Sequence, residues 1–146
     1  MWIYILMALA AGAVLPLQAG LNSQLALSAG NALWASCISF AIGLLLLILV
    51  CVVVRLPRPI WGDLASMPLW LWSGGILGAF FVTAMVTLSP RLGASTMLAM
   101  VLVGQMTAAS LIDHFGLAGF TPHSLSVGRA VGIALLIVGG IVVRLN

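Results

Sequence analysis

Long apolar runs alternate with short polar breaks along this chain. The breaks "SAGN", "RLPRPIWGD", "SPR" and "DHFGLAGFTPHS" contain four of the six prolines and five of the seven charged residues, which would end a helix in lipid. Each run between them has about 20 mostly apolar residues, which is the length an α-helix needs to cross the hydrocarbon core of a bilayer. The pattern predicts five membrane-spanning helices, over residues 2–27, 33–54, 68–88, 94–112 and 126–143.

Composition agrees with this division of the chain. The 146 residues are 64% hydrophobic and 5% charged, whereas soluble domains carry about 25% charged residues. We therefore predict an all-α integral membrane protein, with one five-helix transmembrane domain over residues 1–146. The tryptophans and the tyrosine fall near the predicted helix ends, as in an aromatic belt: Trp2, Tyr4, Trp34, Trp61, Trp70 and Trp72.

The five arginines divide almost evenly between the two membrane faces. With five spans, the loops that contain Arg55, Arg58 and Arg129 share one face, and Arg91 and Arg144 lie on the other. Positive loops stay in the cytoplasm, but three charges against two give little bias. Two interpretations stay open: Arg55 and Arg58 hold their loop inside, or the chain inserts in both orientations. So few charges give no indication of a nucleic-acid partner.

Five helices form a thin bundle, so we expect a partner within the membrane in addition to lipid. Gly74 and Gly78 form one GxxxG pattern and Gly128 and Gly132 form another, and such small-residue faces let helices approach closely. A homodimer of inverted, antiparallel subunits would reproduce the inverted repeat that many transporters carry in one chain. The same glycines could instead pack helices within one subunit.

The stretch "LPLQAGLNSQL" places several polar groups inside the first apolar run. Pro16 should kink this helix and leave the carbonyl of Gly12 without a helical donor. Gln18 and Asn22 are spaced i, i+4 and therefore share a face, where their amides could hold a neutral or zwitterionic polar group. The alternative is that these amides only hold helices together, which is also our interpretation of the neighbouring Ser23 and Gln24.

Gln105 is a second candidate, because it lies inside the fourth span with no charge nearby. An unpaired amide in hydrocarbon is costly, so we expect Gln105 to face the bundle and to bind substrate or protein. Thr83 and Ser95 complete the predicted substrate-binding residues, although each hydroxyl could return to the backbone of its own helix.

Asp113 and Arg129 flank the fourth loop, each at a helix end whose dipole disfavours its charge. Pairing across the loop would relieve both penalties and form a structural clamp. Alternatively, Asp113 assisted by His114 could bind a coupling proton. No acid lies in the middle of a span, so a central carboxylate exchanger is excluded and any proton coupling would use Asp113, His114 or Asp63.

Other chemistry finds no support in the sequence. There is no phosphate-binding loop, no histidine or cysteine cluster with metal spacing and no serine–histidine–acid set. Cys37 and Cys51 are separated by about 21 Å along one predicted helix and cannot form a disulfide. We expect no metal, no cofactor and no enzyme activity.

Three segments, "GAVLPLQAGLNSQLA", "GNALWASCISFAIG" and "RLGASTMLAMVLVGQMTAASLIDHFGLAGF", resemble the YdcZ-like family of small bacterial inner-membrane proteins, a branch of the drug/metabolite transporter superfamily. The resemblance implies a multi-pass protein of the inner membrane that is equivalent to half of a ten-helix transporter and works as an inverted dimer or with a partner copy. It marks Gln18, Asn22, Gln105 and Asp113 as positions of interest, and it implies no particular substrate.

The residues and the resemblance together predict a permease or exporter that moves a small organic metabolite or amphipathic compound by alternating access. The alternative is a non-transporting membrane subunit that modulates a partner or shelters lipid. A transporter should show a cavity with Gln18, Asn22 or Gln105 on its wall, whereas a scaffold should bury these amides in protein contacts.

Overall fold

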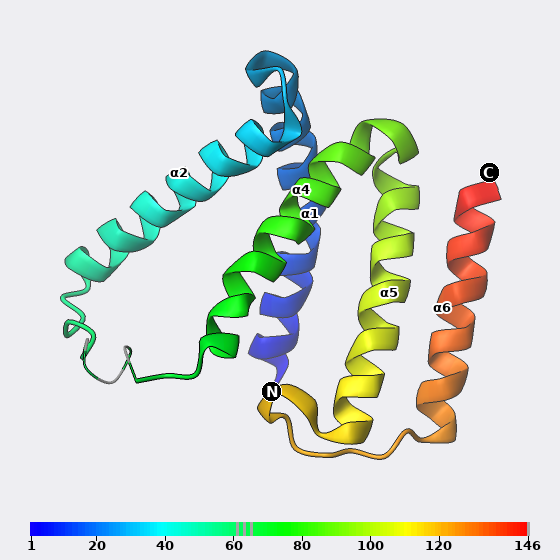
Figure 1. The fold of residues 1–146 in the computed structure, drawn as a ribbon. Helices are drawn as coiled ribbons and strands as arrows, with labels where there is room; N and C mark the ends of the chain where they lie inside the picture. Colours follow the sequence, from blue (N-terminus) through cyan, green and yellow to red (C-terminus); the bar gives the residue numbers. More distant parts are fainter. Residues whose placement is uncertain (61, 63, 65, 146) are drawn as a thin grey trace. The chain divides into compact units, whose positions relative to one another are not determined.

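A computed structural model describes residues 1–60, 62, 64 and 66–145, so the predictions for Trp61 and Asp63 lie outside the described residues. The described part is helical and contains no strand, and five of its helical segments are long and apolar enough to cross a membrane. The predicted fold class is therefore confirmed. The elements, shown in Figure 1, are α1 (Trp2–Ala29), α2 (Ala32–Val53), the 3-10 turn η1 (Leu69–Trp72) leading into α4 (Ser73–Leu92), α5 (Ala94–Phe115), the 3-10 turn η2 (Leu117–Gly119) and α6 (Val127–Leu145).

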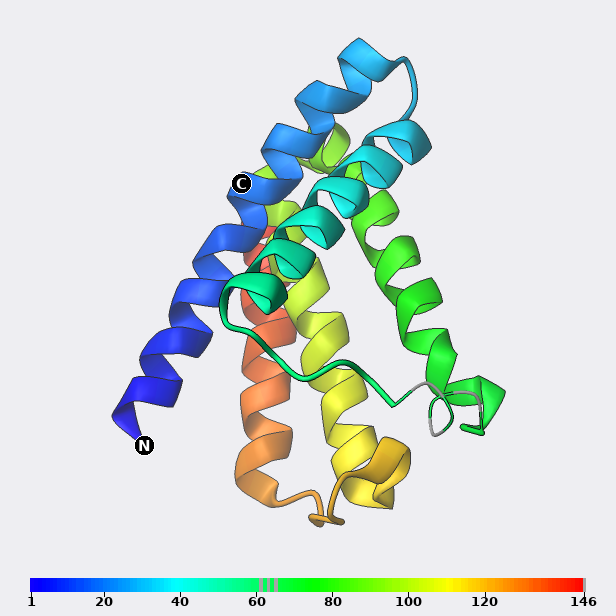
Figure 2. The ribbon, with the colours of Figure 1, turned by 90° about the vertical axis from the view of Figure 1, so that its left-hand side faces the viewer.

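The chain forms two compact units, Met1–Pro90 and Arg91–Asn146, and each is described by itself. A single domain over residues 1–146 stays a prediction. In the first unit, α1 and α2 form an antiparallel hairpin (Figures 1 and 2). Gly30 ends α1 in the left-handed conformation, with φ of 73°, and the Asn31 side chain accepts a hydrogen bond of 2.7 Å from the Leu33 amide. The break predicted at "SAGN" is thus a glycine stop followed by an asparagine cap.

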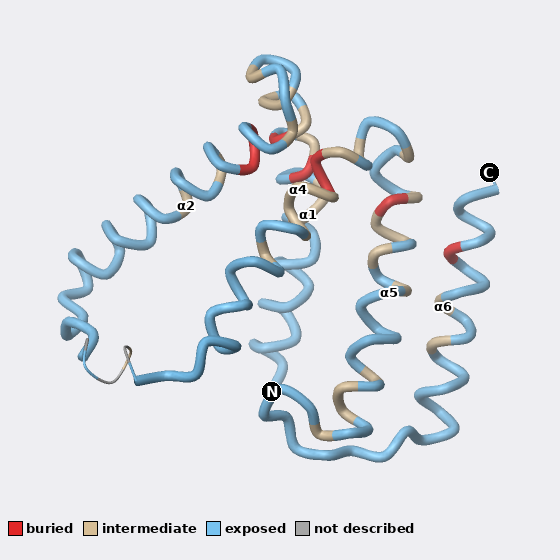
Figure 3. Tube along the Cα trace, viewed as in Figure 1, coloured by how far each residue is buried: buried red, intermediate tan, exposed pale blue. Residues whose placement is uncertain are grey.

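The buried residues of the first unit gather where α1, α2 and α4 meet (Figure 3). Small residues make this contact possible, because Ala19 and Ala35 let the helix backbones approach closely. Thr83 of α4 donates a hydrogen bond of 3.0 Å to Ser36 Oγ of α2, and Ser36 in turn donates to the Ala32 carbonyl of its own helix. Hydroxyls thus join α2 to α4 inside the first unit.

Two prolines lie inside helices rather than at their ends. Pro16 lies within α1, which continues from Trp2 to Ala29, and the predicted kink stays a prediction. Pro90 lies within α4, which continues to Leu92 and so passes the predicted end at residue 88. Because Pro90 has no N–H, the Val86 carbonyl loses its helical donor. The Ser23 Oγ of α1 lies 3.1 Å from Val86 O and 2.8 Å from Ala19 O, so its one hydrogen is shared between the two carbonyls and replaces that donor in part.

The second unit pairs α5 with α6 as antiparallel neighbours (Figure 1). Gly140 of α6 is buried against α5, where an added Cβ would lie 3.1 Å from the Met100 methyl group. The connecting loop turns at Gly116, whose φ is 62° and where an added Cβ would lie 2.7 Å from Pro122 Cγ. Both the backbone conformation and the space therefore require glycine at residue 116.

Candidate functional site

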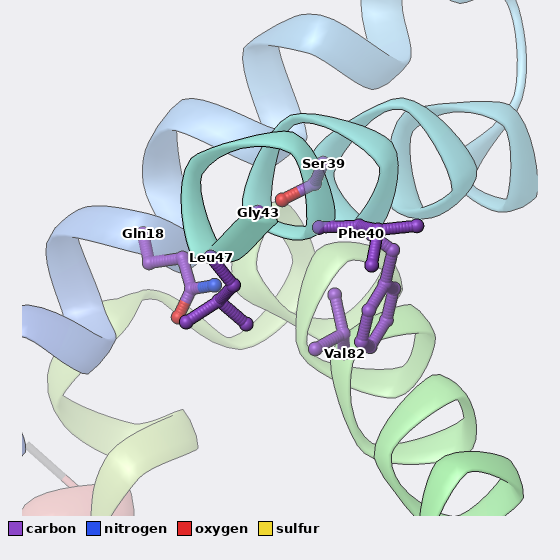
Figure 4. A pocket seen from close by; sticks show the side chains of 7 residues that line it. Gln18, Ser39, Phe40, Gly43, Leu47 and Val82 are labelled. Atoms are coloured by element: carbon purple, nitrogen blue, oxygen red, sulfur yellow. The ribbon is translucent and has the colours of Figure 1, made fainter. Parts of the chain in front are cut away.

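A cavity of about 380 Å³ lies within the first unit, and residues of α1, α2 and α4 line it. We call it the amide cavity, because the side-chain amide of Gln18 lies on the cavity wall. Figure 4 shows Gln18 reaching from α1 towards α2 beside Leu47, with Phe40 of α2 close to Val82 of α4. The lining residues are Gln18, Ser39, Phe40, Gly43, Leu44, Leu47 and Val82.

Asn22 lies one helical turn after Gln18, and the two side chains also line a smaller cavity of about 10 Å³ between α1 and α4. That volume is about what one water molecule needs. Asn22 is only 8% exposed, and its Nδ2 has no hydrogen-bond partner in the described part of the chain. An unsatisfied buried donor costs about 1–3 kcal/mol, so this amide is available for a ligand or a bridging water.

Ser39, Phe40 and Gly43 belong to the cavity but are absent from the residues that the sequence predicted. A signal was present, because Ser36, Ser39 and Gly43 recur at intervals of three and four residues in an otherwise bulky span. These small residues leave space beside the helix. The aromatic ring of Phe40 partly fills the space, and its Cζ would lie 3.8 Å from a Cβ added at Gly78 of α4.

The chemistry of the amide cavity is that of binding rather than reaction. Its wall has no charged side chain and no general acid or base, and its polar groups are the Gln18 amide and the Ser39 hydroxyl. Such groups hold a neutral or zwitterionic ligand by hydrogen bonds while apolar walls hold its hydrocarbon part. Within the described residues, no group of three or more histidine, cysteine or acidic side chains is placed to bind a metal.

The other predicted substrate residues do not line the amide cavity. Thr83 is half-buried and engaged with Ser36, as expected of a residue that joins helices. Ser95 and Gln105 are exposed on the second unit, and no hydrogen bond of either side chain occurs in the described structure. Gln105 is thus not covered by its own unit, and the expectation that it faces the bundle stays a prediction.

Asp113 and Arg129 form an ion pair in the second unit, with Arg129 Nη1 3.3 Å from Asp113 Oδ2. Both side chains are over one-third exposed, at 34% and 44%, and exposed pairs contribute about 0–1 kcal/mol. The loop is also fastened to α5 through its backbone: the His123 amide donates to the Asp113 carbonyl at 2.7 Å, and the Leu125 amide donates to His114 Nδ1 at 3.3 Å. This geometry suits a clamp, and the choice between clamp and proton site stays a prediction.

Comparison with known proteins gives one match. Residues 3–142 match a family model described as "Putative inner membrane exporter, YdcZ", which covers nearly the whole chain. That description is of a transport protein and not of an enzyme. No curated protein and no solved structure matches the chain.

Proposed function

Because this chain belongs to the YdcZ family of multi-pass inner-membrane proteins, as its sequence motifs indicated, we propose that it exports a small neutral or zwitterionic amphipathic compound by alternating access. The family description supports export, and the amide cavity supports the substrate class. Neither the amphipathic substrate nor the alternating mechanism is contained in the family match.

The single observation that carries the proposal is the amide cavity. Its volume of about 380 Å³ lies within the usual 300–1,000 Å³ of small-molecule sites. Gln18 supplies both a donor and an acceptor to the amide cavity, and Asn22 of the adjoining small cavity holds an unused donor that a water could bridge. A ligand with a hydroxyl, amide or zwitterionic head could use these groups, while Phe40 and the leucines would contact its apolar part.

A binding experiment tests the role of Gln18. Purified protein is screened by thermal stabilisation against a panel of neutral and zwitterionic amphipathic compounds, and the affinity of each stabilising compound is then measured by titration. Gln18→Leu keeps a similar bulk and removes about one hydrogen bond, so binding should weaken about three- to tenfold. Gln24→Leu is the matched control, because Gln24 is exposed on the same helix and lies outside the amide cavity.

Either of two results would contradict the proposed substrate class. The first is that Gln18→Leu binds every stabilising compound as tightly as the unaltered protein. The second is that no compound of the panel binds and only charged compounds stabilise the protein. The first result would favour a non-transporting scaffold, in agreement with the engagement of Thr83 and Ser36 in contacts between helices, and the second would favour a charged substrate.

We also propose that the working protein is a homodimer, with its two subunits inverted. The support is Gln105, whose amide is exposed on its own unit and would be unpaired in lipid at a cost of several kcal/mol unless further protein, such as a second subunit, covered it. Gly132 and Gly139 of α6 have open space where a side chain would be, which leaves room for a closely packed helix. The nearly even division of arginines between the two faces supports inversion.

A further inference from the structure

A further cavity of the first unit adjoins the amide cavity at Leu44 and Leu47 and extends to the end of α2. Its volume is about 700 Å³, and we call it the arginine groove. One wall is a face of α2, where Leu44, Leu47, Ile48 and Val52 recur at helical spacing. The segment that follows the helix, residues 56–59, contributes the other wall.

The backbone places Arg55 at the mouth of this groove in an unusual way. Arg55 has a φ of 55°, the left-handed conformation that glycine normally provides at a helix end. The turn is a Schellman motif, in which the Leu56 amide donates to Cys51 O at 3.0 Å and the Arg55 amide donates to Val52 O at 3.1 Å. A glycine would form the same turn with less strain.

Two positive charges therefore stand at one end of an apolar groove. Arg55 and Arg58 are exposed, and neither side chain has an ion pair or hydrogen bond in the described structure. No acidic residue is among the residues that line the groove. The groove thus offers strong hydrogen-bond donors for an anion and, beside them, a long surface for hydrocarbon.

We propose that the arginine groove binds one anionic phospholipid, with its phosphate between Arg55 and Arg58 and an acyl chain along α2. Guanidinium groups match phosphate oxygens in geometry and charge. Residues 44–53 rise about 14 Å along the helix, which is close to the roughly 15 Å hydrocarbon depth of one leaflet. The lipid would be a second ligand beside the exported substrate, so this inference goes beyond the proposed function.

Other occupants fit the groove less well. A free phosphate ion would leave the apolar wall uncovered, and a zwitterionic lipid would bring an ammonium group to a mouth that contains no acid among its lining residues. A second copy of the chain would need an acid to face the arginines. Asp113, the acid among the described residues, is already paired with Arg129.

The test compares lipids that share acyl chains and differ in the head group. Purified protein in neutral detergent is titrated with phosphatidylglycerol, phosphatidylcholine or inorganic phosphate, and bound lipid is counted by native mass spectrometry. We expect the unaltered protein to bind one phosphatidylglycerol tightly. The affinity should fall about fivefold for each arginine removed. Arg55→Gly suits the left-handed backbone and should preserve the fold, and Arg58→Gln removes the second charge. Arg91→Gln is the control, since Arg91 is exposed but lies outside the groove.

The proposal is overturned if phosphatidylcholine binds as tightly as phosphatidylglycerol, if inorganic phosphate competes fully with lipid, or if the double variant Arg55→Gly/Arg58→Gln binds phosphatidylglycerol as well as Arg91→Gln does. Circular dichroism melting shows whether each variant is folded. If Arg55→Gly does not fold, the single change Arg58→Gln decides the matter through its predicted fivefold loss.

Discussion

Neighbouring polar residues of α1 serve different purposes, although the sequence presents them as one cluster. Gln18 is exposed on the wall of the amide cavity, and Asn22 is buried with an unused donor. Ser23 is joined to α4, and Gln24 is exposed near the end of the helix. Because Gln18 and Asn22 are one turn apart, they alone of these four share both a helix face and a cavity.

Asn22 allows a prediction that separates binding from stability. In Asn22→Leu an apolar group of similar shape replaces a buried amide whose nitrogen has no partner. The free energy of unfolding should stay the same or rise by about 1 kcal/mol, because the cost of the unsatisfied donor is removed. Ligand affinity should fall, because the ligand or its bridging water loses this donor. Chemical denaturation in detergent micelles measures the first effect and ligand titration the second.

Ser36→Ala provides the contrast, since Ser36 is buried with partners and its loss should destabilise the protein by about 1 kcal/mol. A clear loss of stability in Asn22→Leu, comparable to that of Ser36→Ala, would mean that Asn22 has a structural partner after all.

The sequence predicted the surroundings of a residue only where its spacing along the helix determines them. Gln18 and Asn22, spaced i, i+4, line the same small cavity, as their shared helix face indicated. Asp113 and Arg129 form the ion pair that their positions at helix ends suggested. Ser39 was missed because a serine in an apolar span usually bonds its own backbone. The environment of Gln105 could not be found from spacing, since it depends on what covers α5.

At the scale of whole elements, the apolar runs were sufficient to locate five helices, but proline was given too much weight in ending them. The third span was predicted to stop at residue 88, whereas α4 continues through Pro90 to Leu92. One proline in the last turn removes a single hydrogen bond, and the Val86 carbonyl that loses it is in part satisfied by the Ser23 hydroxyl, from a distant part of the chain. A contact across 63 residues cannot be read from local sequence.

The replaced hydrogen bond predicts an effect of Ser23→Ala. Removing the hydroxyl takes away the donor that the Ala19 and Val86 carbonyls share, so the free energy of unfolding should fall by about 0.6 kcal/mol, the average for hydrogen bonds between membrane helices, and by about 1.7 kcal/mol at most. Ser28→Ala is the control on the same helix, because Ser28 is exposed and makes no hydrogen bond in the described structure. Equal stability of the two variants would show that Ser23 does not hold α4 in place.

At the scale of the whole molecule, a single copy leaves most of its apolar surface uncovered. The buried residues of the first unit are few and lie at one junction of three helices (Figure 3), and large apolar side chains elsewhere in the described chain are mostly exposed. Lipid can cover these side chains, but it cannot satisfy an amide such as Gln105. In the proposed inverted homodimer, the second subunit would cover Gln105 and could pair with its amide.

Orientation tests the inverted dimer. A reporter fused after Asn146 should show the C-terminus on both sides of the membrane, because three arginines against two give little bias. Two lysines added after Asn146 should drive the C-terminus inward, and two near Met1 should do the reverse. Each fixed-orientation variant should be inactive alone and active when the two are produced together. One fixed orientation of the unmodified protein would exclude the inverted homodimer.

The most direct test of the central claim asks whether water reaches the amide cavity inside the membrane, and it needs no knowledge of the substrate. In a background where Cys37 and Cys51 are alanine, Ser39→Cys places a thiol on the cavity wall, and Leu45→Cys places one on another face of α2 outside the described cavities. Native membranes are treated with a membrane-impermeant maleimide, and the modified fraction is measured by mass spectrometry. A transport pathway predicts extensive modification of Ser39→Cys and little of Leu45→Cys. Equal, low modification of both would mean that water does not enter the cavity, and it would contradict transport through this site.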